Sequence, residues 1–173
     1  MPADTLYEDD IVAWAEQQAQ AIRELSRMRP ELSNVLDWDH VAEEIEGVAQ
    51  DFFYQFTGLT RQFLIHLAKA LSAPQSPSLP HWGVEASDFH DDAIDRFTQS
   101  MRQKVNVDEL WARALKQAKR ALAAHGDALA QDLPPRCPLT LDELVDPEMD
   151  LDKAVSIASV RLGRIAQPIT TLS

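Results

Sequence analysis

The chain has 173 residues, of which 45% are hydrophobic and 25% charged, and its formal net charge is −12. This length accommodates one domain with a buried core that needs no disulfide or metal cross-link. The single cysteine, Cys137, excludes an internal disulfide framework and a cysteine-rich zinc site. The composition therefore predicts an ordinary globular protein.

The negative charge is concentrated in the first third of the chain. Residues 1–51 contain 13 acids and only three bases, Arg23, Arg27 and Arg29. Nucleic acids and anionic membrane surfaces both require basic residues, so we expect neither as a partner. No apolar run approaches the ~20 residues of a membrane-spanning helix, and the acidic start is unlike a signal peptide. The expected location is the cytoplasm.

Apolar residues recur at helical spacing from the start of the chain. They predict a first helix over about residues 5–28, ended by Pro30. Either Asp37 or Asp39 then caps a second helix that reaches residue 71, a length of roughly 50 Å. Its apolar stripe consists of Val41, Ile45, Val48, Phe52, Phe56, Leu59, Phe63, His66 and Ala70. Gly47 and Gly58 are the interior weak points of this long helix, and the sequence leaves open whether the helix is continuous through Gly58.

Prolines punctuate the second half of the chain. Pro74, Pro77 and Pro80 predict an extended linker over residues 72–82, which leaves Trp82 exposed. Ser87 is expected to cap a third helix, whose apolar stripe is formed by Phe89, Ala93, Phe97 and Met101.

Three further signals predict the helices that follow. Asn106 opens a fourth helix, and Gly126 closes it in the left-handed conformation. Thr140 and Glu143 have the spacing of a capping box and predict a short helix before Pro147. A last helix is expected over about residues 151–165.

The resulting fold class is all-α. We expect a helical bundle domain over residues 1–147, built on two long helices and two further ones. Residues 148–173 form a helical tail that packs on the bundle or on a partner subunit. Its apolar stripe consists of Ala154, Val155, Ala158, Leu162 and Ile165.

The first half of the chain contains several short motifs, namely Tyr7-Glu8-Asp9-Asp10, Trp14, Leu36-Asp37-Trp38, Ala42-Glu43-Glu44-Ile45-Glu46, His66-Leu67 and Lys69. Together they resemble a known family, the bacterial domain of unknown function 29. A weaker match continues through Cys137-Pro138, Thr140-Leu141 and Asp146-Pro147. The resemblance implies an all-helical bacterial protein and no assigned activity. It makes Trp14, Asp37, Trp38, Glu43, Glu44, His66 and Lys69 the candidate functional residues.

Acidic pairs on two helices suggest one alternative, a metal-dependent nucleotide phosphohydrolase. Such an enzyme needs several carboxylates that converge on one Mg²⁺. The candidate ligands are Glu43, Glu46, Asp88, Asp91, Asp92 and Asp95. At helical spacing, however, these acids point away from the apolar stripes of their helices. The spacing therefore favours solvated faces, and we expect no metal and no cofactor.

Histidines provide two weaker patterns. His66, the pair His90-Asp91 and Asp127 follow the order of metal ligands in helical phosphohydrolases of the HD type, but a two-residue motif is weak. Glu44 and His66 are separated by roughly 33 Å on a continuous helix, so no relay joins them within one chain. The simpler interpretation makes His66 and His90 histidines at the edge of the core, each with one hydrogen bond.

No motif in the sequence fixes an activity. The second helix is longer than a compact domain of this size needs, and its stripe is rich in Phe. These features favour a non-catalytic, self-associating helical protein–protein interaction module, as a homo-oligomer or with another protein. The phosphohydrolase stays as the alternative.

Overall fold

A computed structural model describes residues 3–164 of the chain and confirms the all-α class, with no strand in that range. Its helices are α1 (Ala3–Asp9), α2 (Ile11–Met28), α3 (Trp38–Ser72), α4 (Leu79–Arg96), α5 (Val107–Ala124), α6 (Leu141–Leu144) and α7 (Leu151–Arg161), with 3-10 helices η1 (Pro30–Asn34) and η2 (Gln99–Gln103). Within residues 3–164, no helix combines the length and apolarity needed to cross a bilayer.

The chain divides into two compact units. Unit 1 comprises residues 1–56 and 96–105, and unit 2 comprises residues 57–95 and 106–173. Helix α3 contributes to both units as one continuous helix, so neither Gly47 nor Gly58 interrupts it. The expected boundary between bundle and tail at residue 147 stays a prediction.

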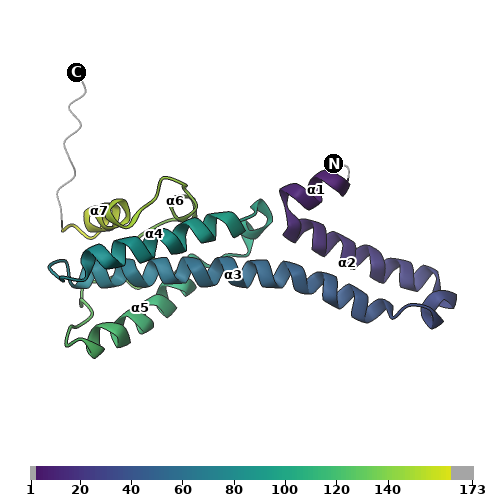
Figure 1. Cartoon of the computed structure of the whole chain (residues 1–173), viewed down its shortest axis with the longest axis horizontal. Helices are drawn as coiled ribbons and strands as arrows, with labels where there is room; N and C mark the ends of the chain where they lie inside the picture. Colours follow the sequence, from purple (N-terminus) through teal and green to yellow (C-terminus); the bar gives the residue numbers. More distant parts are fainter. Residues whose placement is uncertain (1–2, 165–173) are drawn as a thin grey trace, which may run out of the picture. The chain divides into compact units, whose positions relative to one another are not determined.

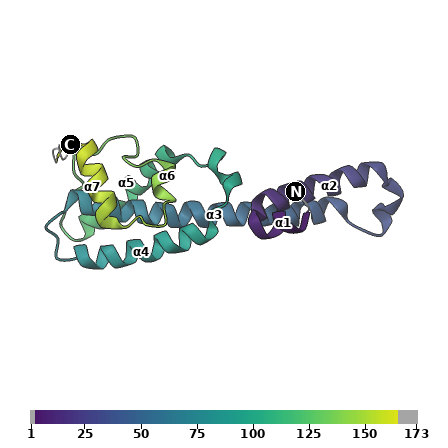
Figure 2. The same ribbon diagram turned by 90° about the horizontal axis from the view of Figure 1, so that it is seen from above.

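Unit 1 is a helical hairpin in which α2 runs back along the N-terminal half of α3 (Figures 1 and 2). The two helices bury small side chains in the seam between them. Ala15 and Ala19 of α2, and Ala42 and Ala49 of α3, are at most 3% exposed. Alanine fits this position because it lets two helix backbones approach closely and costs no side-chain entropy.

The first helix expected over residues 5–28 is wrong at Asp10, where the chain breaks between α1 and α2. Asp10 has non-helical backbone angles (φ −150°, ψ 82°), and its carboxylate caps α2 by accepting from the Ala13 N–H. The same carboxylate accepts from the N–H of Ser100 at 2.9 Å and from its hydroxyl at 2.8 Å. These bonds across 90 residues favour the break over a continuous helix, and periodicity alone does not reveal them.

Unit 2 gathers α4, α5, α6 and α7 around the C-terminal half of α3 (Figure 2). Its core combines alanines with large side chains, among which Phe63, Leu64, Leu67, Trp111 and Leu122 are at most 1% exposed. The buried Trp111 Nε1 donates to the Pro134 carbonyl at 2.8 Å, so its polar atom is satisfied.

The linker expected over residues 72–82 is too long, because α4 begins at Leu79. Pro80 lies in the first turn of α4, where its missing N–H has no helical acceptor in any case. Ser87 is consequently an interior residue of α4 and not a cap. Trp82 is only 7% exposed, so the expectation that it faces solvent is wrong. Phe97 and Met101 follow the end of α4 and belong to unit 1.

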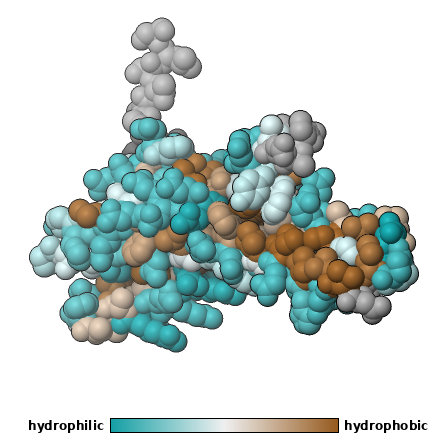
Figure 3. Space-filling view, turned by 45° about the vertical axis from the view of Figure 1, so that its right-hand side comes forward, coloured by the Kyte–Doolittle hydropathy of each residue, from teal (hydrophilic) through white to brown (hydrophobic). Residues whose placement is uncertain are grey.

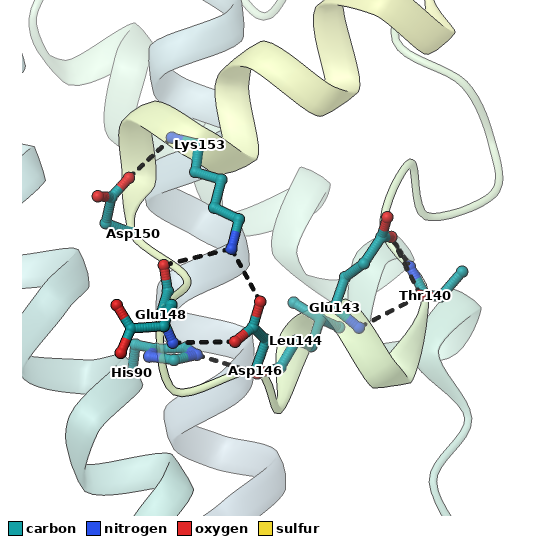
Figure 4. A network of polar contacts seen from close by, with 8 residues as sticks. All are labelled: His90, Thr140, Glu143, Leu144, Asp146, Glu148, Asp150 and Lys153. Carbon is teal, nitrogen blue, oxygen red and sulfur yellow. Dashed lines mark hydrogen bonds and ion pairs between the residues drawn. The ribbon is translucent and has the colours of Figure 1, made fainter.

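The other helix signals are confirmed. The Asn106 side chain accepts from the Glu109 N–H, and Gly126 after α5 has φ +81°. Thr140 and Glu143 form a reciprocal capping box (Figure 4). Asp150 caps α7, which ends at Arg161, four residues earlier than expected. Residue 165 of the expected tail stripe lies outside the described residues.

Candidate functional site

One face of the unit 1 hairpin is polar. The Arg23 guanidinium of α2 contacts the Glu46 carboxylate of α3 at 2.6 Å, and Glu46 raises the pKa of Arg23 through this hydrogen bond. A shallow hollow of about 420 Å³ lies here, lined by Glu16, Gln20, Arg23, Glu24, Arg27 and Glu46. Glu16 also pairs with Lys104 near η2. Charged groups of both signs therefore cover this face of the hairpin.

The other face of the hairpin is apolar. On α3, Val41, Ile45, Val48 and Phe52 fall within about 60° of one another at helical spacing. On α2, Ile11, Trp14, Ile22 and Leu25 occupy the matching stripe. All eight residues keep solvent contact, and Leu25 and Val48 are 39% and 36% exposed. Figure 3 shows apolar side chains gathered over this unit.

The buried contact between α2 and α3, formed by Ala15, Ala19, Ala42 and Ala49, explains why this face stays exposed. We call these four residues the alanine seam. Apart from Val12, which is 1% exposed, the buried residues of α2 are alanines, and the larger apolar side chains Ile11, Trp14, Ile22 and Leu25 keep solvent contact. A contiguous exposed apolar face of this kind is typical of an interaction surface. We call the eight residues Ile11, Trp14, Ile22, Leu25, Val41, Ile45, Val48 and Phe52 the hairpin face.

The start of α3 holds three of the candidate residues. Asp37 accepts from the His40 N–H at 3.3 Å and contacts His40 Nδ1 at 2.6 Å, which raises the pKa of His40. Trp38 is half-buried, and its Nε1 has no hydrogen-bond partner among residues 3–164. Glu43 and its neighbour Glu44 are exposed.

In unit 2, α3 and α4 bring four ionisable side chains together. His66 Nε2 lies 3.7 Å from Glu85 Oε2, and His81 Nε2 lies 3.4 Å from Glu85 Oε1. Lys69 Nζ lies 4.3 Å from the centroid of the Trp82 ring, a cation–π contact. The sequence pattern does not single out Glu85, and it predicts an exposed Trp82, because it places the start of this helix at Ser87 and not at Leu79.

His66 is a neutral imidazole at physiological pH. Burial, with the Lys69 cation as a second cause, lowers the pKa of His66 to about 4. Its side chain is 7% exposed and stacks on Phe89, with 5.9 Å between ring centroids. The expected hydrogen bond to a neighbouring helix is absent within the described part, where His66 Nδ1 has no partner.

Comparison with known proteins assigns the family. The model of the domain of unknown function DUF29 matches residues 6–149. The chain belongs to the DUF29 family. A crystal structure of an alpha-helical protein of unknown function from Rhodospirillum rubrum is 35% identical, with a TM-score of 0.82. The match covers 87% of this chain and 95% of that one. No curated protein matches.

The family motifs occupy both units of this DUF29 chain. The first motifs, from residue 7 to residue 46, lie in the unit 1 hairpin, whereas His66 and Lys69 lie in unit 2. Helix α3 is continuous between Glu44 and His66, so roughly 33 Å of helix separates them. The structure does not join these two residues within one chain, and the functional roles of the motif residues stay predictions.

The carboxylates of the phosphohydrolase alternative face solvent or a base. Glu46 is paired with Arg23, and Glu43 is exposed. The acids of α4, namely Asp88, Asp91, Asp92 and Asp95, are all exposed. Among residues 3–164, no group of three or more His, Cys, Asp or Glu is placed to hold a metal ion.

His90 has the expected structural role. Its side chain is 2% exposed, and its Nε2 donates to the Leu144 carbonyl at 3.1 Å (Figure 4). Burial lowers the pKa of His90, so the ring is neutral and fastens α4 to α6.

Cys137 is not an activated nucleophile. Burial raises the pKa of its thiol to about 12, so the reactive thiolate is not populated at neutral pH. Its backbone N–H donates to Asp108 at 2.9 Å, which ties the loop to the start of α5.

Proposed function

We propose that this DUF29 protein is a non-catalytic helical interaction module that self-associates through the hairpin face. The observation that carries the proposal is the alanine seam, because the eight apolar side chains of the hairpin face lie beside it and stay partly exposed. A second copy offers a surface of the same length and chemistry. Two hairpins in face-to-face contact bury their apolar stripes in a four-helix arrangement.

The size of the hairpin face fits a small dimer interface. An 18-residue helix such as α2 extends about 27 Å at ~1.5 Å per residue, and two adjacent helices are roughly 20 Å wide. The projected face is then about 540 Å² per copy, or about 1,080 Å² for two copies, which clears the ~1,000 Å² expected of a biological interface and lies at the low end of the observed range.

The opposite face of the hairpin limits the assembly to two copies. It is covered by the Arg23–Glu46 ion pair and its charged neighbours, which have no apolar surface to bury. A single self-complementary surface gives a closed twofold dimer and not a filament. The hairpin segments are strongly acidic, so the two copies repel each other and added salt strengthens the dimer.

The test is the mass of the protein in solution. We expect a dimer at micromolar concentrations by light scattering and analytical ultracentrifugation. Val48→Glu places a charge on the hairpin face and is expected to give a monomer. Gln50→Glu adds the same charge to α3 two residues away, at an exposed position outside the face, and is the matched control.

Two results contradict the proposal. One is a monomer mass for the wild-type protein across the whole micromolar range. The other is an equal response of the dimer to Val48→Glu and Gln50→Glu. Far-ultraviolet circular dichroism of both variants verifies that the helices are intact.

A further inference from the structure

A second surface lies in unit 2, between the N-terminal half of α4 and the first residues of α7. A groove of about 580 Å³ is present there. Leu79, Pro80 and Val84 of α4 supply apolar side chains, and Val84 is 62% exposed. The groove therefore exposes an apolar surface that unit 2 does not cover.

Gly83 forms part of this groove, and because glycine has no side chain, the backbone of α4 is not covered by one at this position. A Cβ added at Gly83 meets no atom within 4 Å, so no contact of the described chain requires glycine here. A glycine inside a helix costs about 1 kcal/mol relative to alanine. What glycine provides is a place where another chain can approach the helix backbone closely.

The charged side chains that line the groove are acidic, which indicates the kind of ligand that it binds. Asp88 of α4 and Asp152 of α7 line it and are exposed, with no ion pair to another residue of the described range. Asp150 also lines the groove and accepts from the Lys153 N–H at 2.7 Å, so the N-terminus of α7 is already capped. The groove consequently offers carboxylates to a ligand, which disfavours anions and favours cations.

In the part of unit 2 that the structure describes, no base pairs with Asp88 or Asp152. Lys153, which follows Asp152 in the sequence, contacts Asp146 at 2.8 Å and the Glu148 carbonyl, so its ammonium is already engaged (Figure 4). Residues 165–173 contain no Lys or Arg, so this segment of the chain lacks the matching charge.

We propose that the groove binds a segment of another protein that carries aliphatic side chains beside Lys or Arg. An aliphatic side chain covers the exposed backbone at Gly83 and packs against Val84. The adjacent cations pair with Asp88 and Asp152. This interaction uses a surface of unit 2 and is independent of dimerisation through the hairpin face.

The experiment uses the full chain and a short fluorescein-labelled Leu–Lys peptide as the probe, with titration followed by fluorescence anisotropy. Two control peptides carry Glu in place of Lys, or Ser in place of Leu. We expect both controls to bind at least about tenfold more weakly, which corresponds to ~1.4 kcal/mol. Amide chemical shifts in ¹⁵N-labelled protein locate the peptide, with changes expected at residues 79–88 and 150–152.

Two variants test the groove itself. Gly83→Leu fills it with a residue of higher helix propensity, and we expect affinity for the Leu–Lys peptide to fall about tenfold or more. Asp88→Asn with Asp152→Asn should weaken binding roughly threefold at low ionic strength, an effect that salt removes. The matched control is Asp92→Asn with Asp95→Asn, which removes two exposed charges of α4 outside the groove and leaves affinity unchanged.

The proposal is overturned if folded Gly83→Leu binds the peptide as tightly as the wild type, or if the Glu peptide binds as well as the Lys peptide. It is also overturned if the shift changes gather in residues 38–52, or if binding is lost in Val48→Glu. Either of the last two results assigns the peptide to the hairpin face. A monomeric wild-type protein that still binds the peptide in the groove contradicts dimerisation alone.

Discussion

The two halves of α3 belong to different units and differ in how many of their apolar side chains are buried. Between Phe63 and Leu71, every residue except Lys69 is buried, and large apolar side chains of this segment are part of the core. Between Val41 and Phe52, only two alanines are buried, and the larger apolar residues keep solvent contact. One helix thus serves as a core element in unit 2 and as a surface element in unit 1.

Under the proposed self-association, this difference places stability and association in different units. Hydrophobic stabilisation is roughly proportional to the apolar area removed from water, so unit 2 supplies most of it within one chain. Unit 1 retains apolar area that only another molecule can bury. Substitutions in the two units should therefore affect different measurements.

The largest effect is expected from the core of unit 2. Phe63→Ala removes a ring that is 1% exposed and should cost about 3–5 kcal/mol of unfolding free energy. Val48→Ala, at a position that is 36% exposed, should cost less than about 1 kcal/mol in the monomer. Urea denaturation of dilute protein measures both, and equal costs would remove the distinction between the units.

The second-largest effect is a dependence of the unfolding free energy on pH, which arises from His66 in unit 2. The pKa of His66 is lowered to about 4 in the folded protein, against its ordinary value of about 6.5. As pH falls from 6.5 towards 4, His66 is therefore protonated in the unfolded chain but stays neutral in the folded chain. Stability contributed by neutral His66 is complete above pH 6.5 and is lost over this window, by about 2 kcal/mol between pH 6.5 and 5.

Two histidine variants isolate this contribution. Lys69, Glu85 and His81 are the charged or titratable groups whose fields act on His66, and Glu85 contacts both histidines. His66→Gln should flatten the dependence of the urea midpoint on pH. His81→Gln, at a side chain that is 71% exposed, should leave it unchanged. An unaltered pH profile in His66→Gln would show that the imidazole is protonated within the fold.

Local signals made much of this fold predictable. Helical periodicity and the caps at Asn106 and Thr140 depend on residues within one turn, and the sequence contains them in full. Asp10 and Pro80 led to wrong boundaries for different reasons. The break at Asp10 depends on Ser100, a partner 90 residues away, whereas Pro80 is compatible with either a linker or a first helical turn.

The candidate sites were less accessible to sequence reasoning. The stripe from Val41 to Phe52 is visible in the sequence, but the pattern does not show which side of it faces α2. That choice follows from the tertiary position of Ala42 and Ala49. The groove beside Gly83 requires α4 and α7 to meet, and no local pattern predicts such a contact.

The third prediction tests how unit 1 is held together. Asp10→Ala removes the cap of α2 and the acceptor of both Ser100 bonds, and should cost about 1–2 kcal/mol. Burial raises the pKa of Asp10, but the bonds from Ala13 and Ser100 outweigh it and hold the pKa below its ordinary value. This stability is present above pH 4 and is lost as pH falls further.

Hydrogen exchange assigns the loss to one unit. In Asp10→Ala, we expect faster exchange in α2 and unchanged exchange in α5. Asp9→Ala removes the neighbouring exposed carboxylate at the end of α1 and serves as the control. Equal acceleration in α2 and α5 would mean that the two units unfold together.

The smallest effect is a stabilisation of the hairpin by a single methyl group. Gly47 lies inside α3 in unit 1, and a Cβ there meets nothing within 4 Å. Gly47→Ala should therefore raise the free energy of unfolding by about 0.5–1 kcal/mol through reduced entropy of the unfolded chain. Gly126→Ala provides the contrast in unit 2, because φ is +81° there and a Cβ in that conformation is strained.

We expect slower hydrogen exchange in the N-terminal half of α3 for Gly47→Ala, with the dimer mass unchanged. A Gly47→Ala protein that is less stable or no longer dimeric would place another chain against this glycine, and the partner surface would then extend beyond the hairpin face.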